Sequence, residues 1–267
     1  MEIVIVLGIA LRHRDHRPRQ PAACALGRGS AGLVLVLALV TAKPARADGN
    51  VVDKIYDPYV QPLETELEWR TVYTLDEDDD ALDQRLLQRL GLGRSVSDTW
   101  FVEGYLIASK NEEGNSDDNL SLEGYELEAK WQLTEQGEYD ADWGLLFELE
   151  SERDRNTWEF STALLSVKEW GRWVGSANLF AIYEWGESIN NELESRISLQ
   201  LRYRLSRSLE PALEFYAGQE GQSIGAVLQG TESLGVAKKI HWEAGALTGV
   251  SEKSPDVTFR ALLEYEF

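Results

Sequence analysis

Apolar and polar residues alternate with period two along most of the chain after residue 62, and polar or glycine-rich breaks separate the alternating runs. Such alternation predicts β-strands whose successive side chains point to opposite faces of a sheet. No long helical period and no Pro- or Ser-rich linker interrupts the pattern, so it predicts one all-β domain. The predicted strands are 63–75, 83–94, 99–109, 120–133, 142–151, 157–168, 173–185, 193–205, 211–218, 225–238, 241–250 and 257–267.

The clearest runs have one apolar face and one charged face. In 257–267, Leu263, Tyr265 and Phe267 share a face, and Glu264 and Glu266 share the other. A soluble β-sandwich or a lipocalin-like barrel has the same period with its apolar face turned inward. A membrane barrel is favoured because most runs are long enough to cross a tilted bilayer and no charge interrupts the apolar face of the clearest runs.

Tryptophan residues gather near the ends of the predicted strands. Aromatic rings with a polar edge concentrate at membrane interfaces and form the girdles of outer-membrane barrels. Trp69 is the exception, because it lies nearer the middle of its strand. The pattern therefore predicts a transmembrane antiparallel up-and-down β-barrel of about twelve strands. Its predicted membrane-interface aromatics are Trp100, Trp131, Trp143, Trp158, Trp170, Trp173, Trp185, Trp242, Tyr265 and Phe267.

The first 47 residues have the pattern of a secretory signal. Several arginines precede the apolar run 31–42, and Ala45-Arg46-Ala47 forms a small-x-small cleavage site before Asp48. The apolar run is shorter than the roughly 20 residues of a membrane span, which favours cleavage over anchoring. We expect 1–47 to be a cleavable signal peptide, with an over-extended start as one reading of its first residues. We expect 48–62 to be a periplasmic segment and 63–267 to be the barrel.

Charge excludes one class of partner. The chain has a formal net charge of −20, and residues 1–47 hold seven of its 26 Lys and Arg but only two of its 46 Asp and Glu, so the remainder carries −25. Such a surface repels nucleic acid. The acid runs at 76–80 and 111–118 lie in the breaks after the first and third predicted strands. These breaks fall at the same end of the predicted barrel, as expected of external loops. Neither run has the spacing of a calcium-binding loop, so no metal site is predicted.

The last strand carries the most specific motif. "VTFRALLEYEF" ends on Phe267, with Tyr265, Leu263 and Ala261 at alternate positions before it. With the cleavable signal, this strand resembles those of proteobacterial outer-membrane β-barrel proteins of an uncharacterised family. The resemblance implies residence in the outer membrane of a Gram-negative bacterium and contact with outer-membrane lipid and lipopolysaccharide. It also implies insertion by the barrel-assembly machinery through the strand ending at Phe267.

The charged faces point into the lumen if the apolar faces meet lipid. Acids outnumber bases there, and acidic linings favour cations, so we predict a narrow passive channel for cations or small polar solutes. One alternative is a structural or surface-interaction barrel with a filled lumen and acidic external loops, since twelve strands lie between filled and open barrels. The candidate lumen-facing residues are Glu64, Glu66, Glu68, Arg70, Arg85, Arg89, Glu103, Glu126, Glu128, Lys130, Glu148, Glu150, Glu184, Arg202, Arg204, Glu214, Arg260 and Glu264.

An outer-membrane hydrolase is the second alternative. It would need a nucleophile with a base, or an acid–histidine pair that activates water. After residue 47 the sequence contains one histidine, His241, and the predicted strands place it at a tight turn around Lys239-Ile240. A histidine there is poorly placed for catalysis, so we predict no enzymatic activity, no catalytic residues and no cofactor. The pattern does not decide the oligomeric state, nor whether 53–62 enters the lumen.

Overall fold

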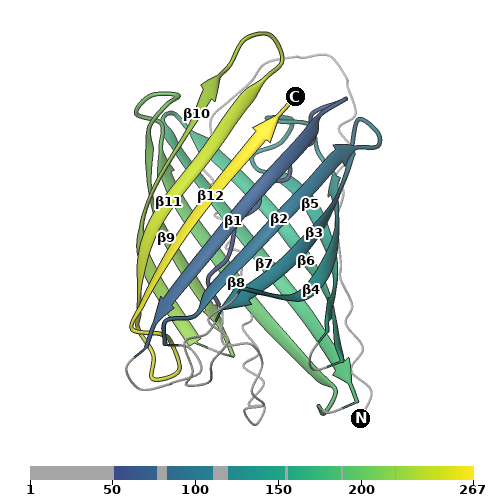
Figure 1. Ribbon diagram of the computed structural model, residues 1–267. Helices are drawn as coiled ribbons and strands as arrows, with labels where there is room; N and C mark the ends of the chain where they lie inside the picture. The colour runs from purple at the N-terminus through teal and green to yellow at the C-terminus, as the bar shows by residue number, and fades with distance from the viewer. Residues whose placement is uncertain (1–50, 77–82, 111–119, 154–155, 188, 220) are drawn as a thin grey trace, which may run out of the picture. The chain divides into compact units, whose positions relative to one another are not determined.

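The computed structural model describes residues 51–76, 83–110, 120–153, 156–187, 189–219 and 221–267 (Figure 1). The predicted signal peptide and nearly all of the two acid runs lie outside these residues. Twelve strands form: β1 (Thr65–Leu75), β2 (Leu86–Ser95), β3 (Trp100–Lys110), β4 (Ser121–Gln132), β5 (Asp142–Glu152), β6 (Thr157–Trp170), β7 (Trp173–Gly186), β8 (Glu192–Tyr203), β9 (Glu210–Gly218), β10 (Gly221–Ser233), β11 (Lys239–Gly249) and β12 (Val257–Glu266). Among the described residues, no helix is long and apolar enough to cross a bilayer.

Every strand pairs antiparallel with its neighbours, and β1 pairs with β12 to close the barrel. At this seam Trp69 lies opposite Leu263 and Glu68 opposite Glu264, and Thr65 and Phe267 exchange two backbone hydrogen bonds. Closure leaves no strand edge with unpaired backbone groups, which a bilayer would not tolerate. The predicted fold class, a closed antiparallel barrel of twelve strands, is confirmed.

The outer and inner faces of the barrel differ in chemistry. Leu67 and Trp69 of β1 are 44% and 42% exposed, whereas the alternate residues Glu68 and Arg70 are buried. Around the barrel, leucines are exposed on the outer face and glutamates are buried on the inner face, which is the reverse of the pattern in soluble proteins. Large apolar side chains stay exposed at this density only where lipid covers them. The strands, of 9 to 14 residues, are long enough to cross a bilayer at a tilt.

The turn between β10 and β11 differs from the prediction. Strand β10 occupies Gly221–Ser233 instead of 225–238, and the turn falls at 234–238. Gly235 and Ala237 have φ values of 120° and 56° in this turn, which end the extended backbone. Alternation alone missed the boundary because apolar residues continue through the turn. His241 therefore lies within β11, not at a turn as predicted.

Candidate functional site

The barrel interior gathers most of the predicted lumen-facing residues. The end of the barrel at which β12 leads into Phe267 carries the last residues of the even-numbered strands and is called the Phe267 end. The opposite end, at the last residue of β1, is called the Leu75 end. The inner face buries ten of the predicted residues: Glu66, Glu68, Arg70, Glu103, Glu126, Glu128, Glu148, Glu214, Arg260 and Glu264. The residues that line the two cavities described below include Glu64, Arg85, Arg89, Lys130, Glu150, Glu184 and Arg202.

Arg204 lies outside the lumen, although it was predicted to face the lumen together with Arg202. Strand β8 ends at Tyr203, so Arg204 lies beyond it at the rim of the Phe267 end. Its guanidinium forms an ion pair of 2.6 Å with Glu169 at the end of β6, and burial is incomplete. Arg202 remains on the inner face and forms an ion pair of 3.3 Å with Glu210. Arg202 therefore belongs to the inner face of the barrel, and Arg204 belongs to its rim.

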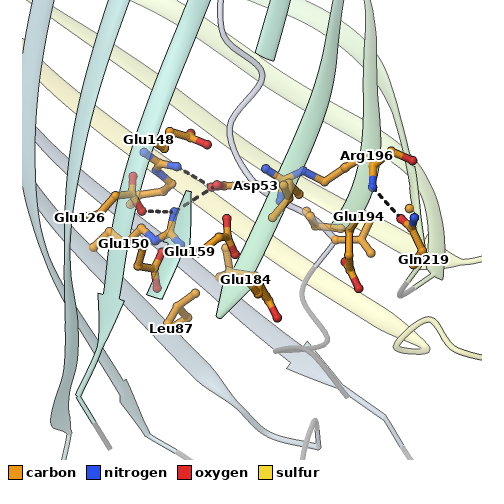
Figure 2. Close-up of a pocket in the computed structure, with 18 of the residues that line it drawn as sticks. Asp53, Leu87, Glu126, Glu148, Glu150, Glu159, Glu184, Glu194, Arg196 and Gln219 are labelled. Atoms are coloured by element: carbon orange, nitrogen blue, oxygen red, sulfur yellow. Dashed lines mark hydrogen bonds and ion pairs between the residues drawn. The ribbon is translucent and has the colours of Figure 1, made fainter. Parts of the chain in front are cut away.

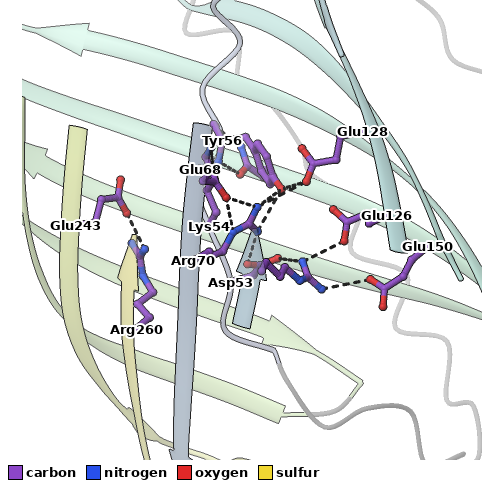
Figure 3. Close-up of polar contacts among 12 residues, drawn as sticks. Asp53, Lys54, Tyr56, Glu68, Arg70, Glu126, Glu128, Glu150, Glu243 and Arg260 are labelled. Atoms are coloured by element: carbon purple, nitrogen blue, oxygen red, sulfur yellow. Dashed lines mark hydrogen bonds and ion pairs between the residues drawn. The ribbon is translucent and has the colours of Figure 1, made fainter. Parts of the chain in front are cut away.

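Residues 51–60 lie inside the barrel and are called here the inserted segment. The segment contacts inward side chains of β1, β4, β7 and β9, strands that lie on different sides of the closed barrel. A segment that contacts strands all around a closed barrel must lie within it. Figure 3 shows its coil among the sticks of Glu68, Arg70 and Glu128. The structure thereby answers the question that the sequence left open for 53–62.

Asp53 and Lys54 attach the inserted segment to β1 and its neighbours through opposite charges. Arg70 Nη1 lies 2.5 Å from Asp53 Oδ1, and Arg89 Nη1 lies 3.2 Å from Asp53 Oδ2 (Figure 3). Lys54 Nζ lies 2.5 Å from both Glu68 and Glu264. Ion pairs buried in this way are stable only when each charge is compensated, because desolvation is costly. The two adjacent residues therefore fix the segment to β1, β2 and β12.

Tyr56 attaches the inserted segment to the opposite side of the lumen. Its backbone N–H donates to Asn178 Oδ1 and its carbonyl accepts from Asn178 Nδ2, each at 2.8 Å. Its side chain belongs to one apolar cluster with five inward residues of β5–β7, which together with the buried Val174 are called here the apolar wall: Leu146, Ala163, Leu165, Phe180 and Ile182. Its hydroxyl crosses back to donate to Glu128 at 2.6 Å. One side chain thus covers apolar surface and still satisfies its polar atom.

The inserted segment leaves the lumen at the Phe267 end. Tyr59 Oη donates to Asp142 at the start of β5, and the Val60 N–H donates to Gln132 at the end of β4, both at 2.7 Å. Gln61 accepts from the Ser95 hydroxyl, and Leu63 has a φ of 67° in the turn that leads into β1. Followed from this turn back toward residue 51, the segment runs along the lumen to the middle of the barrel. There the Tyr216 hydroxyl donates to the Asp53 carbonyl.

Two cavities lie on either side of the central part of the inserted segment. The cavity toward the Leu75 end is narrow, about 80 Å³, and seven carboxylates and four arginines line it (Figure 2). The cavity toward the Phe267 end is about 650 Å³ and reaches the rim residues Gln61 and Gln136. Eight carboxylates and four lysine or arginine residues line this second cavity. The lumen is therefore acid-rich on both sides.

A layer of fully buried side chains separates these cavities. It contains Tyr56, Glu68, Tyr105, Asn178, Glu214, Tyr216 and Arg260, each at most 4% exposed. Among the described residues, none lines both cavities. The layer is therefore a septum across the middle of the lumen, built jointly by the barrel and the inserted segment.

Arg260 is the centre of a second ion-pair network in this septum. Its guanidinium lies 2.5 Å from Glu214 and 2.6 Å from Glu243. Glu243 also lies 3.0 Å from His241 Nε2, and Thr231 lies 3.1 Å from the other ring nitrogen. His241 is thus one member of a hydrogen-bonded interior network, in contrast to its predicted place at a turn.

Two groups of three carboxylates come close together inside the barrel, which sequence spacing did not reveal. Oxygens of Glu66, Glu68 and Glu264 lie within 4.8 Å of one another, as do oxygens of Glu126, Glu128 and Glu148. The ammonium group of Lys54 lies within the first group. Arg89, at 3.2 Å from Glu126, and Arg70, at 3.7 Å from Glu128, lie beside the second. Protein cations thus compensate both groups.

Outside the barrel, the predicted interface aromatics form two belts. Trp100 stacks on Trp131 at 5.2 Å and Tyr265 stacks on Phe267 at 5.3 Å, at the Phe267 end. Trp158 and Trp185 stack at 6.5 Å at the Leu75 end. Also at the Phe267 end are Trp143, Trp170, Trp173 and Trp242.

Sequence reasoning missed the residues of the inserted segment and its main partners. Asp53, Lys54 and Tyr56 lie in a stretch without period two, which no strand pattern could place. Asn178 offered a signal, because it is an amide on the uncharged part of the inner face of β7, between Ser176 and Phe180. A fully buried amide needs hydrogen-bond partners, and the segment supplies them.

Comparison with known proteins identifies the fold. An outer-membrane channel from Pseudomonas putida F1 is similar with a TM-score of 0.54 at 14% identity, over 81% of this chain and 99% of that chain. The KdgM porin gives 0.49 at 12% identity, over 76% and 99%. The translocator domain of autotransporter NalP from Neisseria meningitidis gives 0.45 at 12% identity, over 79% and 90%. No protein-family model and no curated protein matches the chain. The first similarity shows that the chain has the fold of an outer-membrane β-barrel.

Proposed function

We propose that the protein is a passive outer-membrane channel for cations or small polar solutes. The observation that carries this proposal is the pair of acid-lined cavities on the two sides of one septum. Acidic linings raise the local concentration of cations and repel anions. The outer-membrane fold and the exposed apolar band support its location in the outer membrane of a Gram-negative bacterium.

Orientation and assembly belong to the same proposal. We place the Phe267 end at the periplasm, after removal of residues 1–47. Outer-membrane lipid and lipopolysaccharide would contact the aromatic belts, and the barrel-assembly machinery would recognise strand β12. Outer-membrane fractionation and a heat-modifiable band on gels would support this placement.

Conductance in planar bilayers tests the channel. With a KCl gradient across the bilayer, we expect a reversal potential displaced toward the equilibrium potential of K⁺. The recordings should include the wild-type protein and a full-length Asp53→Asn/Lys54→Gln variant whose inserted segment is more weakly held. Anion-selective current, or no current from either protein, would contradict the proposal.

A closed structural barrel is the second candidate, and the septum is the observation that favours it. In that case neither protein would conduct, and function would lie in the external loops. The same recordings therefore decide between the two functions.

A further inference from the structure

We propose that the inserted segment is a movable plug, and that its displacement opens an acidic constriction selective for cations. The proposal rests on the channel function and names the residues that would control it. Asp53, Lys54 and Tyr56 would hold the plug in place, and Glu66, Glu68, Glu103 and Glu264 would line the opened passage.

The septum depends on the inserted segment. Tyr56 fills the space between the apolar wall and Glu128, and Asp53 and Lys54 fill the space beside β1 and β12. Their contacts are hydrogen bonds, ion pairs and apolar packing to side chains of the barrel wall. The wall itself is held by its own closed ladder of strand pairs, which does not include the segment. Displacing the segment therefore removes part of the septum and leaves the barrel closed on itself.

The connection to β1 allows such a displacement. The segment joins β1 through a turn at 61–64, where Leu63 has a left-handed backbone and Glu64 donates to the Gln61 carbonyl. The turn lies at the rim of the Phe267 end, next to the wider cavity of about 650 Å³. The segment can rotate about this turn toward that cavity without breaking a strand pair.

The charges left behind determine what would pass. Lys54 is the cation nearest to Glu68 and Glu264 among the described residues, at 2.5 Å from each. Without it, the three clustered carboxylates Glu66, Glu68 and Glu264 lose this compensation. Glu103 of β3 lines the same cavity as Glu66 and Glu264. Arg70 and Arg89 lose Asp53 but keep Glu68, Glu126 and Glu150 as partners. The segment carries Asp53, Lys54 and Asp57, so its displacement adds no net negative charge, but it leaves the carboxylate cluster beside β1 and β12 facing the passage. Such an acidic lining favours cations.

Two full-length variants test the plug in opposite directions. The first, Asp53→Asn/Lys54→Gln, weakens the ion pairs and keeps side chains of similar size. The second, Val52→Cys/Leu247→Cys, joins the segment to β11 within an existing apolar cluster when oxidised. After residue 47 the natural sequence has no cysteine, so this bond would have no competitor. The matched controls are Lys168→Gln, which removes an exposed ion pair with Asp140, and the single Val52→Cys variant.

Single-channel recordings in KCl gradients give the readout. We expect the weakened variant to open at least about tenfold more often than wild type, the factor that about 1.4 kcal/mol of lost anchoring would produce. Its reversal potential should move further toward that of K⁺. The oxidised double-cysteine variant should open less than wild type and recover with a reductant, while both controls behave like wild type.

The outcomes separate the plug from the channel. Cation-selective currents that neither the weakened anchors nor the reversible tether alters would overturn the plug and leave the channel function intact. Silence from all proteins, including the reduced tether and the weakened variant, would overturn both. If the weakened variant fails to fold, the oxidation-dependent change in the tethered protein still decides the proposal.

Discussion

The two sides of the lumen have opposite chemistry. Around β12 and β1–β4 the inward residues are charged, as in Glu68, Arg70 and Glu128. Across the lumen, β5–β7 carry the uncharged apolar wall, in which Leu165 and Val174 are fully buried, while their inward carboxylates line the cavity toward the Leu75 end. An apolar surface that faces the lumen needs a cover, because its exposure to water is unfavourable. The difference explains why a chain segment lies in this lumen.

The inserted segment matches both sides. Tyr56 covers the apolar wall, and the adjacent Asp53 and Lys54 compensate charges on the other side. A segment with only one of these chemistries would leave either apolar surface or buried charge without a partner. We therefore expect substitutions on the charged side to destabilise the protein by leaving buried charges without partners. Substitutions in the apolar wall should destabilise it by loss of packing.

The largest effect is expected on the charged side. Arg260→Met leaves Glu214 and Glu243 buried without their guanidinium partner, so it should lower the free energy of unfolding by about 3–5 kcal/mol. Urea unfolding in detergent micelles, followed by tryptophan fluorescence, measures the change. Lys168→Met, which removes an exposed pair, should change it by less than about 1 kcal/mol. Equal effects of the two variants would contradict a buried network.

The apolar wall can be compared with the lipid face through two neighbouring leucines of β6. Leu165 is fully buried inside the barrel, and Leu164 is 39% exposed outside. Leu165→Ala should cost about 3–5 kcal/mol, because it leaves a cavity against Tyr56. Leu164→Ala should cost about 2 kcal/mol, the transfer term alone, since lipid chains fill the space. The same unfolding assay measures both, and a larger loss at Leu164 would reverse the assignment of faces.

Asn178 tests the contact between the apolar wall and the inserted segment. Asn178→Leu fits the wall but leaves the backbone N–H and carbonyl of Tyr56 without their partners, so it should cost about 2 kcal/mol. Ser176→Ala, two residues earlier on the same inner face, should change stability by about 0.5 kcal/mol or less. Limited proteolysis should cleave the inserted segment faster only in the Asn178 variant. Unchanged cleavage would mean that the amide does not hold the segment.

The smallest effect on stability is expected at Glu64, at the rim of the Phe267 end. Burial and a hydrogen bond with the Glu266 carboxylate raise the pKa of Glu64 from 4.5 to about 7. The folded protein therefore keeps this proton between pH 4.5 and 7 while the unfolded chain loses it, so stability falls as the pH rises through this range. Above pH 7 the Glu64→Gln variant should be more stable than wild type by about 1 kcal/mol, allowing for solvent screening at the rim.

Gel-shift unfolding temperatures at pH 5 and pH 8 measure this difference. The stabilisation by Glu64→Gln should be present at pH 8 and smaller at pH 5. Glu135→Gln, in a solvent-exposed turn, is the control and should respond equally at both values. A stabilisation that is larger at pH 5 would contradict the raised pKa.

Much of the barrel could be predicted from residue patterns. Eleven of the twelve strands lie close to their predicted ranges, because alternation is strong where lipid meets one face and charge the other. The boundary of β10 was wrong because the turn at 234–238 is itself apolar. The inward placement of Glu68, Arg70 and Glu264 followed from the same alternation, whereas Arg204 was misplaced because β8 ends one residue before it.

The architecture and its two surfaces follow from local patterns, since period two and strand length report directly on face and span. What fills the lumen depends instead on contacts between distant parts of the chain. The contacts of Asp53, Tyr56 and Asn178 join positions up to 163 residues apart. Such contacts depend on which strands lie opposite one another in the closed barrel, and no local pattern records that. The outward face is therefore predictable residue by residue, and the inner septum is a property of the closed barrel.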